Sequence, residues 1–84
     1  MYIEFALPSS SQAAGLILKE LDNRIAAWSE RFRVVYRRKV VKYTLRITFD
    51  DDEMYHFFAL TWQPESHNDV LTHYLKNFRL VEPK

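Results

Sequence analysis

Basic residues gather in one segment of this 84-residue chain. Residues 31–46 contain seven of the twelve arginines and lysines and no acid, so this segment carries a charge of +7, whereas the whole chain carries +1. Guanidinium and ammonium groups neutralise phosphates, and a cluster of them produces a local positive field. We therefore expect an anionic partner. The seven basic residues are Arg31, Arg33, Arg37, Arg38, Lys39, Lys42 and Arg46.

Two aromatic residues are expected beside these cations. If residues 41–49 and 54–62 form a hairpin around an acidic turn, Tyr55 and Phe57 share a face with Arg46. Such a face suits single-stranded nucleic acid, because bases stack on rings at about 1–3 kcal/mol each while cations neutralise phosphates. The predicted nucleic-acid-binding residues are Arg33, Arg37, Arg38, Lys39, Lys42, Arg46, Tyr55 and Phe57.

The basic strand also supports a hypothesis of protein binding. Residues 32–40 have no partner in the expected hairpin, so their backbone donors and acceptors are open to another chain. A protein partner, or a homodimer formed through this overhanging strand, would complete the sheet, as in an interaction, regulatory or inhibitor module. The simplest interpretation is a solvated basic face with two ordinary strand-forming rings.

The residue types that catalysis and cofactor binding need are sparse. Gly15 is the only glycine, which excludes the Gly-rich loops that hold phosphates in nucleotide-dependent enzymes. The absence of cysteine excludes thiol catalysis and thiolate metal sites. His67, Asp69 and His73 do not assure the three or four ligands of a zinc site. We therefore predict a non-enzymatic module with no cofactor, no metal and no small-molecule substrate.

Hydrophobic periodicity predicts the elements that position these residues. Alternating apolar residues indicate strands, and the first of these strands directs Tyr2 toward the basic face. Apolar spacings of three and four indicate helices. The predicted elements are a strand over 2–7, a helix over 14–30, a strand over 32–49, a strand over 54–62, a helix over 66–77 and a short edge strand over 79–82.

The order of these elements, β-α-β-β-α with a possible last strand, predicts a two-layer α+β fold with two helices on one face of a mostly antiparallel sheet. It resembles the ferredoxin-like arrangement, on which RNA-recognition domains carry rings on the sheet, although their strand signature contains glycines. The alternation of apolar residues shifts by one position within residues 32–49, which predicts a β-bulge at 37–40. If residues 32–49 instead form two strands, the fold is an α-β-β-β-α meander with an extra N-terminal strand, as in double-stranded RNA-binding domains.

Length and composition predict a single domain over residues 1–84. The first residues lack the basic start of a signal peptide, and Glu4 interrupts their apolar run. No stretch approaches the roughly 20 apolar residues that span a membrane. We therefore expect a cytoplasmic protein without a membrane partner.

Overall fold

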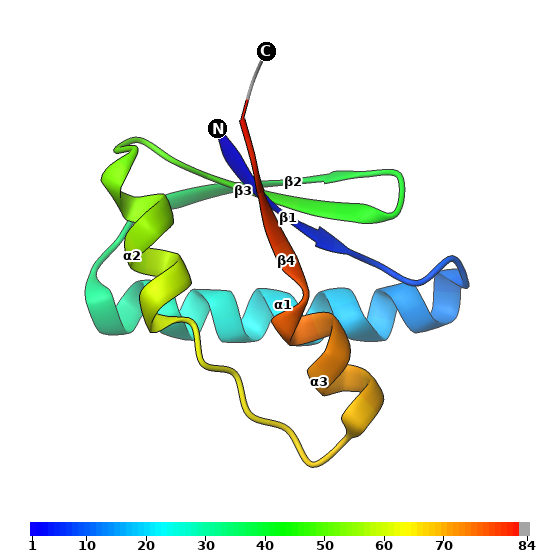
Figure 1. The fold of residues 1–84 in the computed structure, drawn as a ribbon. Helices are drawn as coiled ribbons and strands as arrows, with labels where there is room; N and C mark the ends of the chain where they lie inside the picture. The colour runs from blue at the N-terminus through cyan, green and yellow to red at the C-terminus, as the bar shows by residue number, and fades with distance from the viewer. Residues whose placement is uncertain (83–84) are drawn as a thin grey trace.

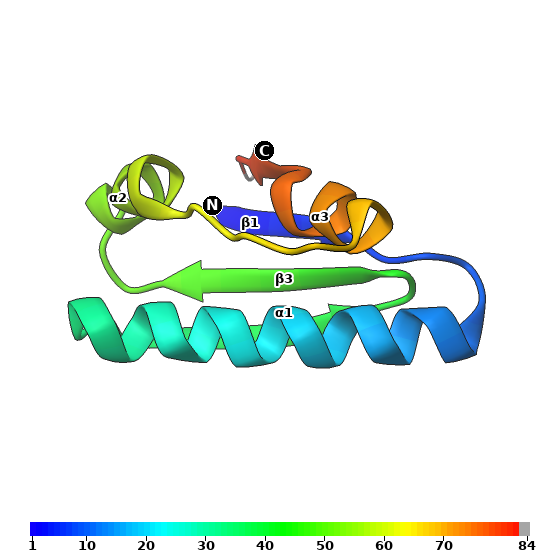
Figure 2. The same cartoon turned by 90° about the horizontal axis from the view of Figure 1, so that it is seen from below.

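The chain folds as two layers, a four-stranded antiparallel sheet and three helices that cover one of its faces (Figures 1 and 2). The computed structural model describes residues 1–82, so residues 83 and 84 of the predicted domain lie outside it. The elements are β1 (Tyr2–Ala6), α1 (Ser11–Phe32), β2 (Tyr36–Val41), β3 (Thr44–Phe49), α2 (Glu53–Thr61), α3 (Asp69–Lys76) and β4 (Phe78–Val81).

The strands lie in the order β2-β3-β1-β4, which is consistent with the ferredoxin-like arrangement. Strands β1 and β3 form the centre, and β2 and β4 form the two edges. The predicted two-layer α+β class is confirmed. The predicted helices over 14–30 and 66–77 correspond to α1 and α3, and the short last strand is β4.

The prediction of one bulged strand over residues 32–49 is wrong. Helix α1 continues to Phe32, and Arg33 ends it in the left-handed region with φ 55°. Strands β2 and β3 then pair around a two-residue turn in which Lys42 has φ 54°. Glycine or asparagine usually occupies left-handed positions, so an arginine and a lysine there gave no indication of a turn. The alternative, which divides this segment into two strands, is correct on this point.

The prediction of a strand over residues 54–62 is also wrong, because this segment forms α2 and the residue after it. Its buried residues are Tyr55, Phe58 and Trp62, whose spacing of three and four places them on one side of a helix. The Asp51 carboxylate accepts a hydrogen bond of 2.9 Å from the Glu53 N–H at the helix start. Acidic groups at this end also interact favourably with the helix dipole.

The overhanging strand that would have supported a homodimer is therefore absent from the described residues, 1–82. Phe32 belongs to α1, and each residue from Tyr36 to Val41 has a register partner in β3. The outer edge of β2 remains unpaired within this part of the chain. Protein binding at that edge stays a prediction, without the overhang that motivated it.

A cluster of aromatic rings joins the helices to the sheet. Phe58 of α2 has no exposed surface and stacks on Trp62, with ring centroids 4.9 Å apart and planes inclined by 20°. Its edge also meets Trp28 of α1 at 4.9 Å and Phe5 of β1 at 6.2 Å. Aromatic side chains bury large apolar areas, so this cluster fixes α2 against both α1 and the sheet.

Candidate nucleic-acid interface on the open sheet face

The face of the sheet opposite the helices carries a line of charged residues that crosses all four strands. The strand registers place Lys39 of β2 opposite Arg46 of β3, Arg46 opposite Glu4 of β1, and Glu4 opposite Arg79 of β4. We call these four residues the transverse row. Residues directly opposite on neighbouring strands project from the same face and lie close enough to interact. With three cations and one carboxylate, the row has a net charge of +2.

Glu4 holds two of these cations in place. Its side chain is only 11% exposed, and its Oε1 accepts hydrogen bonds from Arg79 Nε at 3.0 Å and from Arg79 Nη2 at 2.7 Å. Its other oxygen, Oε2, lies 3.8 Å from Arg46 Nε, too far for a hydrogen bond. Glu4 therefore organises the centre of the open face and leaves part of the Arg46 donor capacity unused.

Arg46 is positioned by an aromatic ring. Its Cζ lies 4.6 Å from the centroid of the Tyr2 ring, the geometry of a cation–π contact. The buried Nε of Arg46 has no hydrogen-bond acceptor among residues 1–82. Because this Nε is itself buried, a ligand reaches Arg46 only through the exposed part of the side chain, which is 36% exposed.

Beside the row lies a shallow hollow of about 350 Å³, which we call the basic depression. Of its lining residues, four are cationic and, within residues 1–82, none is a carboxylate. The lining comprises Tyr2, Arg37, Arg38, Lys39, Arg46 and Thr48. Because Tyr2, Lys39 and Arg46 come from three neighbouring strands, the sheet itself fixes the spacing of the ring and the charges.

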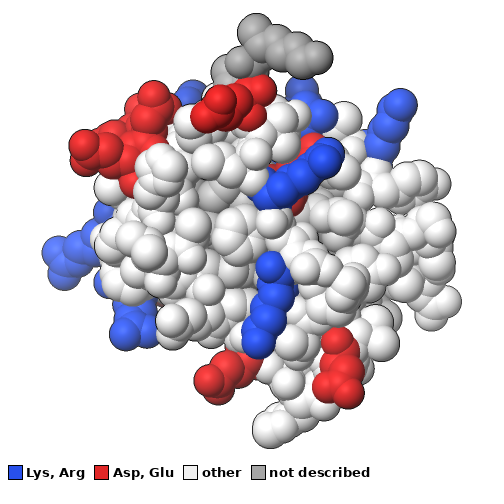
Figure 3. All heavy atoms as spheres, in the orientation of Figure 1, with Lys and Arg blue, Asp and Glu red and all other residues white. Residues whose placement is uncertain are grey.

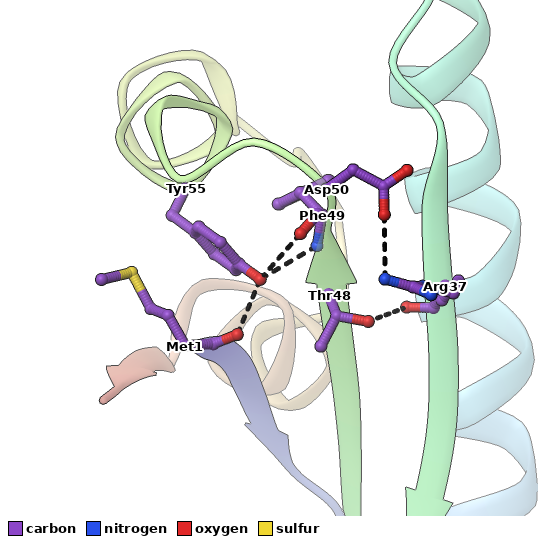
Figure 4. A network of polar contacts seen from close by, with 6 residues as sticks. All are labelled: Met1, Arg37, Thr48, Phe49, Asp50 and Tyr55. Carbon is purple, nitrogen blue, oxygen red and sulfur yellow. Dashed lines mark hydrogen bonds and ion pairs between the residues drawn. The ribbon is translucent and has the colours of Figure 1, made fainter. Parts of the chain in front are cut away.

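Three of the four cations of the basic depression lie near carboxylates: Glu4 lies beside Arg46, and Arg37 and Arg38 have partners of their own. Arg37 donates to Asp50 Oδ1 at 2.8 Å, and both side chains are about three-quarters exposed (Figure 4). Arg38 starts from the other side of β2 and pairs with Asp22 of α1 at 2.8 Å. Solvent-exposed ion pairs contribute only about 0–1 kcal/mol, so an anionic ligand can compete for these arginines.

The structure brings together four of the eight predicted site residues, namely Arg37, Arg38, Lys39 and Arg46. Arg33 instead caps the end of α1, and Lys42 occupies the β2–β3 turn. Neither residue lines the basic depression. Their left-handed backbones place them in connections between elements, outside the alternation of the strands.

Tyr55 and Phe57 are not on the open face, and their prediction as stacking residues is wrong. Tyr55 is 3% exposed, and its hydroxyl accepts from the Phe49 N–H at 3.0 Å and donates to the Met1 carbonyl at 2.6 Å (Figure 4). Phe57 packs edge-on against Phe32 with ring centroids 5.0 Å apart. Both rings attach α2 to the rest of the fold and are unavailable to a base.

The acidic run over residues 50–53 is exposed and lies where α2 begins. Figure 3 shows acidic side chains gathered over this end of the molecule. The predicted turn at these residues is therefore confirmed as a connection, although it joins a strand to a helix and not two strands. Negative charge at this end repels a polyanion, which restricts the favourable surface to the remainder of the open face.

Other groups in the described residues have local structural roles. No three His, Cys, Asp or Glu side chains within residues 1–82 form a group that could hold a metal ion, and the His73 ring contacts Asn77 Nδ2. Burial, and secondly the Asp22 carboxylate, raise the pKa of Tyr36, against the opposing effect of Arg38. None of the helices formed by residues 1–82 has the length and apolar content needed to cross a membrane.

The sequence analysis missed Arg79, Glu4 and Thr48 as parts of this surface. Arg79 alternates with the apolar residues of β4, but its place beside Glu4 depends on the pairing of the first and last strands, which no local pattern reveals. Comparisons of the chain with protein-family models, with curated proteins and with solved structures gave no match.

Proposed function

We propose that the open sheet face binds single-stranded nucleic acid and that the protein acts as a non-enzymatic binding module. One observation carries this proposal: the basic depression is lined by four cationic residues, a tyrosine and a threonine, with no carboxylate from residues 1–82, and three of the cations, Arg37, Lys39 and Arg46, lie on the open face. A polyanion gains most where cations are clustered, and here it competes with the carboxylates of Asp50 beside Arg37 and Glu4 beside Arg46. An extended single strand of nucleic acid also needs a shallow, open surface, which this face provides.

Phosphates are contacted by Arg37, Lys39 and Arg46 in this proposal. Arg37 and Lys39 alternate along β2, so their Cα atoms are about 6.6 Å apart, and Arg46 lies one strand away at about 4.8 Å. These spacings suit a short, extended segment of a few nucleotides. Arg37 exchanges its exposed partner Asp50 for a phosphate, and the exposed part of the Arg46 side chain contacts another.

A base stacks at the pair formed by Tyr2 and Arg46. The guanidinium lies over the tyrosine ring at 4.6 Å, and bases stack both on rings and on guanidinium planes. The structure therefore supports one stacking position, in place of the several expected with Tyr55 and Phe57. A single stacking position and three phosphate contacts suit weak binding with little dependence on base sequence.

The test is a fluorescence anisotropy titration of a labelled single-stranded oligonucleotide at several salt concentrations. For three phosphate contacts, we expect log K to fall with log salt with a slope of about −2. The variant Arg37→Gln/Lys39→Gln/Arg46→Gln should lose nearly all of this slope and bind at least about tenfold more weakly at low salt.

A matched control changes three cations on the helices, with Lys19→Gln/Arg31→Gln/Lys76→Gln. These residues are exposed and lie outside the basic depression, so the control loses the same net charge. The proposal predicts that the control keeps most of the wild-type affinity and slope. Equal loss in the two triple variants would show that total charge, and not this face, determines binding, and no binding by the wild type would exclude the function.

Protein binding at the outer edge of β2 is less well supported than nucleic-acid binding. Arg37, Arg38 and Lys39 are consecutive exposed cations on that edge strand. Charged side chains on an edge strand oppose pairing with another strand, and two copies of this edge would place like charges side by side. A homodimer through β2 is therefore disfavoured electrostatically, and a partner there would have to be acidic.

A further inference from the structure

A second pocket, of about 220 Å³, lies in the helical layer and is independent of the open sheet face. One wall is the C-terminal half of α1, and the other is the end of α2 with residues 62–64. We call it the indole pocket, because both tryptophans of the chain, Trp28 and Trp62, line it. The lining also includes Arg24, Ala27, Arg31, Phe32 and Thr61.

The apolar floor of the indole pocket is fixed by internal hydrogen bonds. Trp28 Nε1 donates to Thr61 Oγ1 at 2.8 Å, and that hydroxyl donates to the Phe57 carbonyl at 2.7 Å. Trp62 Nε1 donates to the Leu75 carbonyl at 2.8 Å. Both indole N–H groups are satisfied within the protein, so the small part of each ring that stays exposed is apolar; Trp28 is 6% and Trp62 8% exposed.

Two of the four polar residues that line the indole pocket, Arg24 and Arg31, are cationic. Arg31 Cζ lies 5.2 Å from the centroid of the Phe32 ring, in a cation–π contact. Glu20 Oε2 is 3.5 Å from Arg24 Nε, an ion-pair distance without a hydrogen bond. The buried Arg24 Nε therefore has no acceptor within residues 1–82. No carboxylate of the described residues lines the pocket.

We propose that the indole pocket binds a small aromatic carboxylate. The aromatic ring of the ligand lies against the tryptophan rings, and its carboxylate accepts hydrogen bonds from the Arg24 guanidinium and attracts Arg31. The size is suitable, because a cavity of about 150 Å³ accommodates benzene, and 220 Å³ leaves room for one ring with a carboxylate. Mostly apolar walls with a few convergent polar groups are typical of small-molecule sites.

Tryptophan fluorescence provides the test, since both tryptophans line the pocket. Titration of the full chain with benzoate should change the emission saturably, and the neutral analogue benzamide should bind at least about tenfold more weakly. In an NMR titration, the two indole N–H resonances should shift with the same dissociation constant as the fluorescence change.

Two variants test the pocket in different ways. Arg24→Gln should weaken benzoate binding about tenfold, and Ala27→Phe, at an exposed position lining the pocket, should fill it and abolish binding. Thermal unfolding confirms that each variant is folded. Lys19→Gln, on the same helix but outside the pocket, is the matched control and should bind as the wild type does.

Some results would overturn the proposal. These are a response that does not saturate, equal binding of benzoate and benzamide, or unchanged binding in folded Ala27→Phe. Loss of the response in the sheet variant Arg37→Gln/Lys39→Gln/Arg46→Gln would place benzoate on the open face and exclude the indole pocket. Retained binding in that variant, with loss in Arg24→Gln, supports the pocket whether or not the sheet binds nucleic acid.

Discussion

Strand β3 and helix α2 are neighbours in the sequence, and both are rich in aromatic and aliphatic residues, yet they occupy different layers. In β3, the buried residues Leu45, Ile47 and Phe49 alternate with polar ones, so only a strand can bury them together. In α2, six of the nine residues are apolar, and both a period of two and a period of 3.6 fit the sequence. The difference shows that polar residues, by interrupting the apolar ones, are what make a periodicity specific.

Capping and packing decide between the two periods in α2. Asp51 accepts a hydrogen bond from the Glu53 N–H at the start of the helix, and three large aromatic residues, Tyr55, Phe58 and Trp62, meet the existing core only in helical geometry. In a strand, Phe58 and Leu60 would project from the same face. In the observed helix, Phe58 is fully buried, whereas Leu60 is 77% exposed.

The largest expected effect is on the free energy of unfolding, and it differs between Phe58 and Leu60 of α2. Phe58→Ala removes the centre of the aromatic cluster and should lower the free energy of unfolding by about 3–5 kcal/mol. Leu60→Ala should change it by less than about 0.5 kcal/mol, because an exposed side chain loses little on truncation. Urea denaturation of both variants measures the difference. Similar losses would indicate that residues 54–62 form a strand after all.

A smaller effect is expected on the sheet side of the comparison. Tyr2→Leu removes the ring beneath Arg46 and should weaken oligonucleotide binding by about 1 kcal/mol or more, at least about fivefold. Tyr43→Leu, at a tyrosine exposed in the β2–β3 turn, is the matched control and should leave affinity unchanged. Anisotropy titration measures both, and equal effects would show that Tyr2 has no special position.

The two lysines of the β2–β3 hairpin should respond oppositely to glycine. Lys42→Gly places glycine at φ 54° and should stabilise the fold by about 0.5–1 kcal/mol, because the left-handed region is unfavourable for a residue with Cβ. Lys39→Gly, within β2, should destabilise it by about 0.5–1 kcal/mol. Both variants lose one positive charge, so thermal or urea unfolding isolates the backbone effect. Destabilisation by Lys42→Gly would contradict the observed turn.

The smallest effect concerns pH. Burial and Asp22 raise the pKa of Tyr36 above its ordinary value of 10.0, so near this pH the folded state retains a proton that the unfolded state releases. This contribution to stability is present below pH 10 and is lost as the pH rises through the folded-state pKa. Tyr36→Phe should therefore lose less stability than the wild type in alkaline solution, as measured by urea unfolding on both sides of pH 10. An unchanged pH dependence would show that Tyr36 titrates alike in both states.

The parts of the fold that the sequence predicts are those with a specific period or a recognisable end. Helix α1 has an apolar stripe and begins after Ser10, which accepts a hydrogen bond from the Ala13 N–H. The alternation in β1 is equally clear. By contrast, the boundary between α1 and β2 and the turn between β2 and β3 lie at Arg33 and Lys42, whose left-handed conformations are imposed by the surrounding structure.

The positive charge of the candidate site could be predicted from the sequence, but the full set of its residues could not. The basic segment contains Arg37, Lys39 and Arg46, and pairing of neighbouring strands brings these three together. The ring that accompanies them comes from Tyr2, which was expected on this face, and not from Tyr55 or Phe57. Arg79 and Glu4 join through contacts between the two ends of the chain, and such long-range pairing leaves no trace in a local sequence pattern.

The place of β1 in the middle of the sheet has a consequence for how the chain acquires its structure. Both neighbours of β1, namely β3 and β4, are distant in the sequence, so its ladders form only after long loops have closed. During synthesis β1 cannot pair until β3 has been made, and its other edge stays unpaired until β4 has been made. We therefore expect slow, late formation of the sheet, and an exposed, aggregation-prone edge in any chain that stops before β4.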